Sequence, residues 1–325
     1  MTNELIKNTT TGFSVWQFIQ AKLAAGLHTM LLLVVQSEGS SPGRQGFKMA
    51  VAADGNFTGT IGGGIMEFKL VEKAKTLLHK KEASISLMHQ HHDKEWGAKH
   101  SGMICSGSQI VVFVPINGTN KHVVDSICDS LVNNKEKSIA VLPKNIFLED
   151  GTKREWRYFS DEEWQYAEPL QQQPTVHIIG GGHVSLALSE LLHFIGFTVN
   201  VYDDRPDLNT LSANNFTAVK QIVDYNSIGE NIFTNENDYV VIMTIGYRTD
   251  KIVLKQLIAR KLAYLGMLGS RKKVDTLFSE LKAEGLTALQ LDKVSSPVGL
   301  QINSHTAQEI AVSIAAEIIQ HKNKR

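Results

Sequence analysis

The sequence has little of what several classes of protein depend on. Its 325 residues include only two cysteines, Cys105 and Cys128, too few for a disulfide framework or for a zinc site made of cysteines. Its longest apolar run, MLLLVV at residues 30–35, is far shorter than the roughly 20 residues of a membrane-spanning helix. The N-terminus shows neither a basic segment nor a long apolar one, so we see no signal peptide and expect a cytoplasmic protein.

An excess of charge of either sign is missing too. The chain has 33 basic and 33 acidic side chains, and these are spread along the sequence rather than grouped. Binding to nucleic acid or to an anionic membrane draws on clustered positive charge. We therefore expect neither a nucleic acid nor a membrane as partner.

The length of the chain fits about two domains. Residues 1–165 are expected to form an α/β domain with a mixed sheet. Residues 161–175, DEEWQYAEPLQQQPT, have the composition of a linker, which we place at residues 166–173. Residues 174–325 alternate strands with helices, which predicts a Rossmann-like domain with a doubly wound parallel sheet.

Three consecutive glycines, Gly62, Gly63 and Gly64, end the glycine segment GTIGGG (residues 59–64). Apolar residues recur at helical spacing from Ile65 onward, so an amphipathic helix is expected to start on the glycines. A helix start leaves backbone N–H groups unpaired, and glycines let an anion such as phosphate approach them. Tight packing between strand and helix needs the same residues, and the local sequence does not decide between these two interpretations.

Two other segments carry groups suited to an anion or a cofactor. The serine-arginine loop SSPGRQG (residues 40–46) supplies the hydroxyls of Ser40 and Ser41 and the guanidinium of Arg44. The cysteine segment SGMICSG (residues 101–107) places Cys105 between two glycines immediately before an apolar strand, where a thiol can be exposed. A small buried residue is the alternative interpretation of this cysteine.

The second domain opens with a dinucleotide-binding pattern, TVHIIGGGHVSLALSELLHFIGFTVNVYDDR. Gly180 and Gly182 occupy the first two glycine positions of G-x-G-x-x-G, and Ser185 replaces the third. Asp203 ends the second strand at the distance where an acid can bind a ribose 2′-hydroxyl, whereas Arg205 could favour a 2′-phosphate. NAD, NADP or another nucleotide is therefore an open expectation.

The histidines do not define a catalytic or metal site. On a strand, His89 and His91 share a face while His92 points away, so we interpret SLMHQHHDKEW as a solvated loop. His183 lies in the glycine turn, where it would be near a pyrophosphate rather than a nicotinamide. We assign no catalytic residue and count His183 with the dinucleotide-binding residues.

Several motifs in order make the chain resemble the xanthine dehydrogenase accessory factor family, the XdhC/CoxI-type proteins. The motifs are GSSPGRQGFKM, GTIGGGIME, Cys105 in its glycine setting, HIIGGGHV, AYLGMLGSRKK and SPVGLQINSHTAQEIAVSIAAEI. The resemblance implies a non-catalytic chaperone that binds the molybdenum cofactor and protects it during sulfuration. It would then insert the cofactor into an apo molybdenum hydroxylase such as xanthine dehydrogenase. A homodimer is implied as well, and a cysteine desulfurase is a candidate partner.

The resemblance also suggests roles for the residues above. The terminal phosphate of molybdopterin would be received by residues 62–64, with Ser40, Ser41 and Arg44 closing over its other side. Glu67, in the first helical turn, would orient the loop or bond pterin nitrogens.

Cys105 would be the soft ligand that contacts molybdenum or its sulfur.

This chain departs from the family where Gly43 follows the proline, a position at which arginine is frequent. In the second domain Thr244 and Asp250 match the family, but Ile245 replaces a histidine. Two alternatives of other classes are an NAD(P)-dependent oxidoreductase and a nucleotide-sensing regulatory protein.

Overall fold

Two compact units make up the chain, residues 1–172 and 173–325. The computed structural model describes residues 12–80, 83–91, 107–133, 135–170 and 173–324. The linker expected from residue 166 is a strand instead, because Glu163–Pro169 (β9) pairs with a neighbouring strand of the first unit. Trp164 and Tyr166 lie two residues apart and are both buried, a strand periodicity that the surrounding polar residues hide in the sequence.

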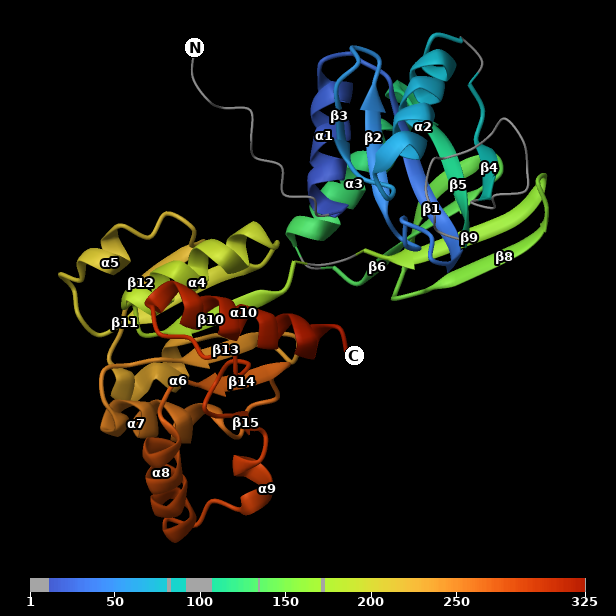
Figure 1. Cartoon of the computed structure of the whole chain (residues 1–325). Coiled ribbons are helices and arrows are strands. Elements are labelled where there is room, and N and C mark those ends of the chain that lie inside the picture. Colours follow the sequence, from blue (N-terminus) through green and yellow to red (C-terminus); the bar gives the residue numbers. More distant parts are fainter. Residues whose placement is uncertain (1–11, 81–82, 92–106, 134, 171–172, 325) are drawn as a thin grey trace. The chain divides into compact units, whose positions relative to one another are not determined.

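Two antiparallel sheets form the framework of the first unit (Figure 1). The five-stranded sheet has the order β3-β2-β1-β5-β4, with β1 (Thr29–Gly39), β2 (Lys48–Ala52), β3 (Phe57–Gly59), β4 (Ser86–His91) and β5 (Gly107–Ile116). The four-stranded sheet has the order β7-β6-β9-β8, with β6 (Lys137–Leu142), β7 (Asn145–Asp150) and β8 (Glu155–Ser160) beside β9. The expected α/β class is confirmed, and the pairings of both sheets in the described part of this unit are antiparallel rather than mixed.

Helices cover both faces of the five-stranded sheet. They are α1 (Gly12–Ala24), α2 (Gly64–Leu78) and α3 (Lys121–Val132). Leu31 and Leu33 of β1 pack into the core shared with α1, α3 and the four-stranded sheet, whereas Met30 and Leu32 face α2. Because β1 is buried on both faces, its sequence is an uninterrupted apolar run rather than an alternating one.

The second unit has a six-stranded parallel sheet of order β12-β11-β10-β13-β14-β15. Its strands are β10 (Thr175–Ile179), β11 (Thr198–Asp203), β12 (Val219–Ile222), β13 (Tyr239–Ile242), β14 (Tyr264–Met267) and β15 (Val294–Ser295). Its helices are α4 (His183–Phe194), α5 (Asn209–Ser212), α6 (Ile228–Asn231), α7 (Tyr247–Leu257), α8 (Arg271–Ala283), α9 (Ala288–Leu291) and α10 (Ala307–Lys322). The expected Rossmann-like fold is confirmed, because the strand order reverses direction between β10 and β13.

Helices lie on both faces of this sheet (Figure 1). Leu188 of α4 and Ile314 of α10 belong to the core of one face, and Leu254 of α7 and Leu277 of α8 belong to that of the other. The carboxyl ends of β10 and β13 therefore meet at the point where ligands bind in folds of this kind.

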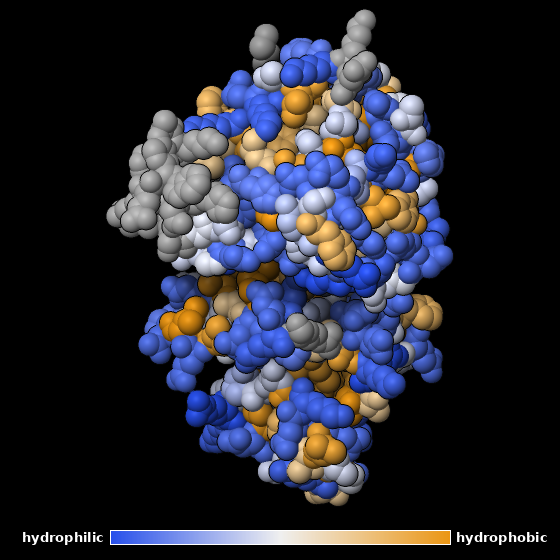
Figure 2. Space-filling model, turned by 90° about the vertical axis from the view of Figure 1, so that its right-hand side faces the viewer, coloured by the Kyte–Doolittle hydropathy of each residue, from blue (hydrophilic) through white to orange (hydrophobic). Residues whose placement is uncertain are grey.

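Hydrophilic residues predominate on the surface face shown in Figure 2, where apolar residues form small separate groups. Phe68, Phe159 and Phe233 are among the exposed large apolar side chains of the chain. Among the described residues, no helix combines the length and the apolar character needed to span a membrane.

Candidate functional site

The serine-arginine loop contacts both the glycine segment and Gly107, the one residue of the cysteine segment that the structure describes. A Cβ atom added to Gly43 would lie 2.3 Å from the carbonyl oxygen of Ile61, and one added to Gly62 would lie 2.4 Å from the nitrogen of Gly43. A Cβ atom on Gly107 would lie 2.6 Å from the nitrogen of Ser41. Backbones this close leave no room for a side chain. The serine-arginine loop is thus packed between the glycine segment and the end of the cysteine segment.

Glu67 organises the glycine segment. Its Oε2 atom accepts hydrogen bonds from the Thr60 hydroxyl at 2.6 Å, from the Ile61 N–H at 2.9 Å and from the Gly63 N–H at 3.0 Å. One carboxylate oxygen therefore bridges the turn that leads into α2. Of the two roles suggested for Glu67, these contacts match the orientation of the loop.

The start of α2 lies where the sequence placed it, with Gly63 as the residue before the first helical turn. A Cβ atom on Gly63 would meet nothing within 4 Å, so the space above this glycine is open. Among the described residues no side chain caps the helix, and the first N–H groups of α2 stay available to an acceptor. The predicted apolar stripe is wrong at its beginning, because Ile65 and Phe68 are 55% and 65% exposed.

The serine-arginine loop presents its polar groups unequally. Ser41 is buried, and its hydroxyl donates to Gln109 Oε1 at 2.9 Å. Gln109 in turn donates to Gln90 at 2.5 Å, so Ser41 belongs to a buried chain of hydrogen bonds that ties the loop to β5 and β4. Ser40 and Arg44 are exposed, and among the described residues the guanidinium of Arg44 makes a single 3.4 Å hydrogen bond, to the Gly39 carbonyl. Within the part of the chain that the structure describes, the candidate side chains of this loop open to a ligand are therefore Ser40 and Arg44.

The structure describes one of the two cysteines, Cys128. Cys105 lies outside the described residues, so its role stays a prediction. Cys128 is buried in the core beside α1, and burial together with the charge of Asp125 raises the pKa of its thiol to about 11. Cys128 is therefore a packing residue.

The segment interpreted as a solvated loop is a strand up to residue 91. His89 lies in β4, where one ring nitrogen is 2.9 Å from the Asp161 carboxylate and the ring packs edge-on against Tyr158. His92 lies outside the described residues. The contacts of His89 are thus those of a structural residue linking β4 to the turn between β8 and β9.

In the second domain, Gly180 and Gly182 have distinct roles at the start of α4. Gly180 has φ 112°, and a Cβ atom there would lie 2.3 Å from the Met243 carbonyl oxygen, so the turn after β10 packs on the turn after β13. A Cβ atom on Gly182 would meet nothing within 4 Å. His183 is exposed in the first turn of α4. The helix start is therefore open in the manner that a pyrophosphate requires.

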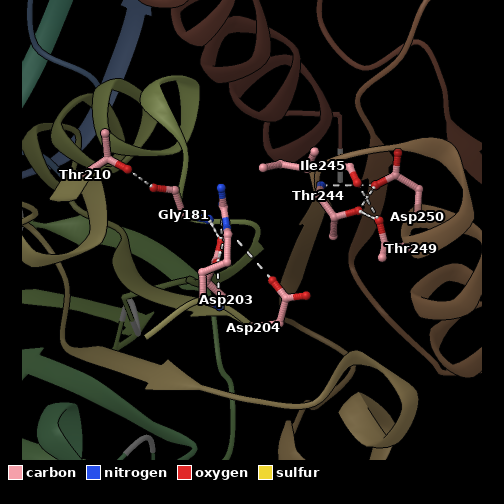
Figure 3. A network of polar contacts seen from close by, with 9 residues as sticks. Gly181, Asp203, Asp204, Thr210, Thr244, Ile245, Thr249 and Asp250 are labelled. Atoms are coloured by element: carbon pink, nitrogen blue, oxygen red, sulfur yellow. Dashed lines mark hydrogen bonds and ion pairs between the residues drawn. The ribbon is translucent and has the colours of Figure 1, made fainter. Parts of the chain in front are cut away.

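Asp203 is fully buried, and its acceptor positions are already in use (Figure 3). Its Oδ2 atom accepts the Gly181 N–H at 2.6 Å and Nη2 of Arg205 at 2.8 Å. Its Oδ1 atom accepts the backbone N–H of Arg205 at 2.9 Å and Nε at 2.8 Å. Burial by itself raises the pKa of this carboxyl, but the hydrogen bonds from Arg205 and Gly181 outweigh burial and hold the pKa below its ordinary value.

Thr244 and Asp250 form a second buried network that sequence reasoning only partly anticipated (Figure 3). Asp250 Oδ1 accepts the Thr244 N–H at 3.0 Å and the Thr244 hydroxyl at 2.6 Å. Lys273, from α8, donates to Asp250 Oδ2 at 2.5 Å. Lys273 belongs to the motif GSRKK, but the sequence does not predict its pairing with Asp250, because 23 residues separate the two.

A hollow of about 460 Å³ opens beside this network at the starts of α7 and α8. It is lined by Gly246, Tyr247, Ser270, Lys272, Lys273 and Thr276. Ile245, at the position where the resemblance suggests a histidine, is 71% exposed next to it. An exposed isoleucine side chain therefore takes the place of the imidazole that the resemblance suggests at position 245.

These features define a two-domain protein in which a Rossmann domain follows a domain built around converging glycine loops. The family model described as the XdhC Rossmann domain matches residues 176–318, and that of the XdhC and CoxI family matches residues 23–89. Together the two matches extend over more than half of the chain. The protein belongs to the XdhC and CoxI family.

Two curated relatives are similar along most of the chain. The uncharacterised protein YqeB of Escherichia coli (strain K12) is 28% identical over 89% of this chain, which spans only 43% of YqeB. A probable xanthine dehydrogenase subunit from Bacillus subtilis (strain 168) is 24% identical over 91% of this chain and 93% of that protein.

A solved structure has the same fold. It is described as a xanthine dehydrogenase from Bacillus halodurans, and it matches with a TM-score of 0.78 over 95% of this chain and 96% of its own at 21% identity. At this identity the likeness supports the fold and not a particular activity.

Proposed function

We propose that the protein is an accessory factor that binds the molybdenum cofactor and delivers it to an apo-enzyme of the xanthine dehydrogenase type. Membership of the XdhC and CoxI family supports an accessory role in the maturation of such an enzyme. The observation that carries the proposal is the contact among the serine-arginine loop, the glycine segment and the end of the cysteine segment. These segments lie far apart in sequence, and one cofactor could touch all three.

The residues present suit the phosphate end of a molybdopterin. The space above Gly63 is open, the start of α2 has no side-chain cap among the described residues, and Arg44 is exposed on the adjoining loop. Positive charge and free N–H groups are what a phosphate requires. Glu67 already occupies the N–H of Gly63, so the phosphate would contact the N–H groups that follow it and the Arg44 guanidinium.

Cys105 would contribute the thiolate that contacts molybdenum or its sulfur, a match between a soft donor and a soft site. The cofactor supplies the redox chemistry of the enzyme that receives it. The role of this chain is to bind the cofactor, exclude water from it and release it, with no catalytic residue of its own.

The second domain is proposed to bind a nucleotide at the open start of α4. Its Asp203 carboxylate is saturated by Gly181 and Arg205, so it has no acceptor left for a ribose hydroxyl. This occupation disfavours the standard NAD contact, and with it the alternative of an NAD-dependent oxidoreductase.

The test is retention of isolated molybdenum cofactor by the purified protein on gel filtration, followed by reconstitution of an apo-xanthine dehydrogenase. Cys105→Ala and Gly63→Asp are expected to lose retention. Gly151→Asp is the matched control, because Gly151 has a similar φ of 80° and open space but lies in the turn between β7 and β8. Cys128→Ala controls for the loss of a thiol. Failure of the wild-type protein to retain cofactor would refute the proposal.

A further inference from the structure

A buried ion pair lies beneath the serine-arginine loop. Nζ of Lys48 is 2.6 Å from Oε1 of Glu168, and the two side chains are 9% and 7% exposed. Lys48 is the first residue of β2 and Glu168 lies in β9, so the pair joins the two sheets of the first domain. Lys48 lies in the motif GSSPGRQGFKM, but its partner Glu168 falls in the segment interpreted as a linker, so the sequence does not predict the pair.

The same groups contact the end of the loop directly. Lys48 also donates to the Gly46 carbonyl at 2.8 Å, and a Cβ atom on Gly46 would lie 3.1 Å from Oε2 of Glu168. That Oε2 atom accepts the Tyr166 hydroxyl at 2.7 Å. Burial, with the charge of Glu168, raises the pKa of Tyr166, so the hydroxyl stays protonated and keeps donating. Lys48 thus holds the Gly46 carbonyl, while Glu168 is held by the charge of Lys48 and by the Tyr166 hydroxyl.

Stability alone does not account for such a cluster. Removing two charges from water costs several kcal/mol for each ion, and well-packed apolar residues of similar volume are often as stable or more so. A buried pair can instead select one conformation of the backbone that it touches. Here that backbone is the end of the loop that carries Ser40 and Arg44.

We propose that Lys48 and Glu168 are positioning residues that fix the serine-arginine loop in the conformation that binds the cofactor. The buried chain from Ser41 through Gln109 to Gln90 holds the beginning of the loop, and the Lys48–Glu168 pair holds its end. A loop fixed at both ends loses less conformational entropy when a ligand binds. This inference rests on the function proposed above.

The test is the double variant Lys48→Met/Glu168→Leu, which replaces the pair with apolar side chains of similar size. It is made in a Tyr166→Phe background, so that no buried hydroxyl is left without its Glu168 acceptor. Its thermal midpoint is expected to stay close to that of the wild type, whereas its affinity for isolated molybdenum cofactor falls roughly 10-fold. The matched control is Lys137→Met/Asp150→Leu, which removes an exposed ion pair from the four-stranded sheet. The control should change neither quantity.

A second readout does not need the cofactor. Arg44 is exposed, so trypsin can cleave after it once the loop departs from its fixed conformation. Cleavage after Arg44 should be roughly 10-fold faster in the double variant and unchanged in the control. Unchanged cleavage, or affinity lost only in proportion to a lowered thermal midpoint, overturns the inference. Faster cleavage in a protein that never retains cofactor supports the positioning role and rejects the proposed function.

Discussion

Asp203→Asn should destabilise the second domain while leaving the first unaffected. The carboxylate is fully buried and accepts four hydrogen bonds, one from Gly181 and three from Arg205. An asparagine carbonyl can keep about half of them, but its NH₂ group would face donors. Hydrogen bonds to a charged group contribute about 1.5–3 kcal/mol each, and Arg205 is exposed enough to recover hydration, so we expect a loss of about 3 kcal/mol.

The size of the domain converts this loss into a thermal shift. For a domain of 150–250 residues, about 1 kcal/mol lowers the midpoint by roughly 2–4 °C, so scanning calorimetry should show a drop of roughly 6–12 °C in one of the transitions. Asp204→Asn is the control, because Asp204 is 45% exposed and only approaches Arg205 at 3.9 Å. Equal midpoints for the two variants would refute the reasoning.

The same carboxylate predicts a pH dependence with a definite sign. Its pKa in the folded protein is below the ordinary value, so the unfolded chain binds the proton more readily. The contribution of Asp203 to the free energy of unfolding is present above about pH 4 and is lost as the pH falls through the folded-state pKa. Denaturant titrations between pH 3 and pH 7 should therefore show a steeper acid loss in wild type than in Asp203→Asn.

Three further predictions concern packing and charge. Gly43→Ala should destabilise the first domain more than Gly63→Ala, because a Cβ atom on Gly43 meets a backbone carbonyl oxygen at 2.3 Å. Gly63 has open space, so a side chain there meets only the strain of φ 75° and ψ −176°, which costs about 1–3 kcal/mol. Urea titration compares the two variants, and the reverse order would contradict the packing. Cys128 should resist iodoacetamide at pH 8 in the folded protein, since its thiol has a pKa of about 11; rapid labelling seen by mass spectrometry would show that it is not buried. Asp250→Asn should lower stability by about 1–3 kcal/mol, because the ammonium of Lys273 loses its charged partner; an unchanged calorimetric midpoint would assign the pair no net contribution.

Local sequence patterns predicted those elements of the fold that depend on residues close together in the chain. The glycine segment leading into α2 and the strand, turn and helix around Gly180 follow from periodicity and from the conformations open to glycine. The parallel sheet of the second domain follows from the alternation of strands with helices. The strand β9 was missed because the polar residues around Trp164 and Tyr166 resemble a linker, and its burial depends on the distant strands that it pairs with.

The sequence by itself determined the family motifs, the Rossmann alternation and the residue types suited to a phosphate, because each of these is a property of short segments. Only the tertiary structure decided which of those residues are free. Folding commits Ser41 to Gln109, Asp203 to Arg205 and Gly181, and Glu67 to its own loop, while Arg44 stays exposed. The physical reason is that a buried polar group must find a hydrogen-bond partner, and the partner depends on which backbones the fold brings together.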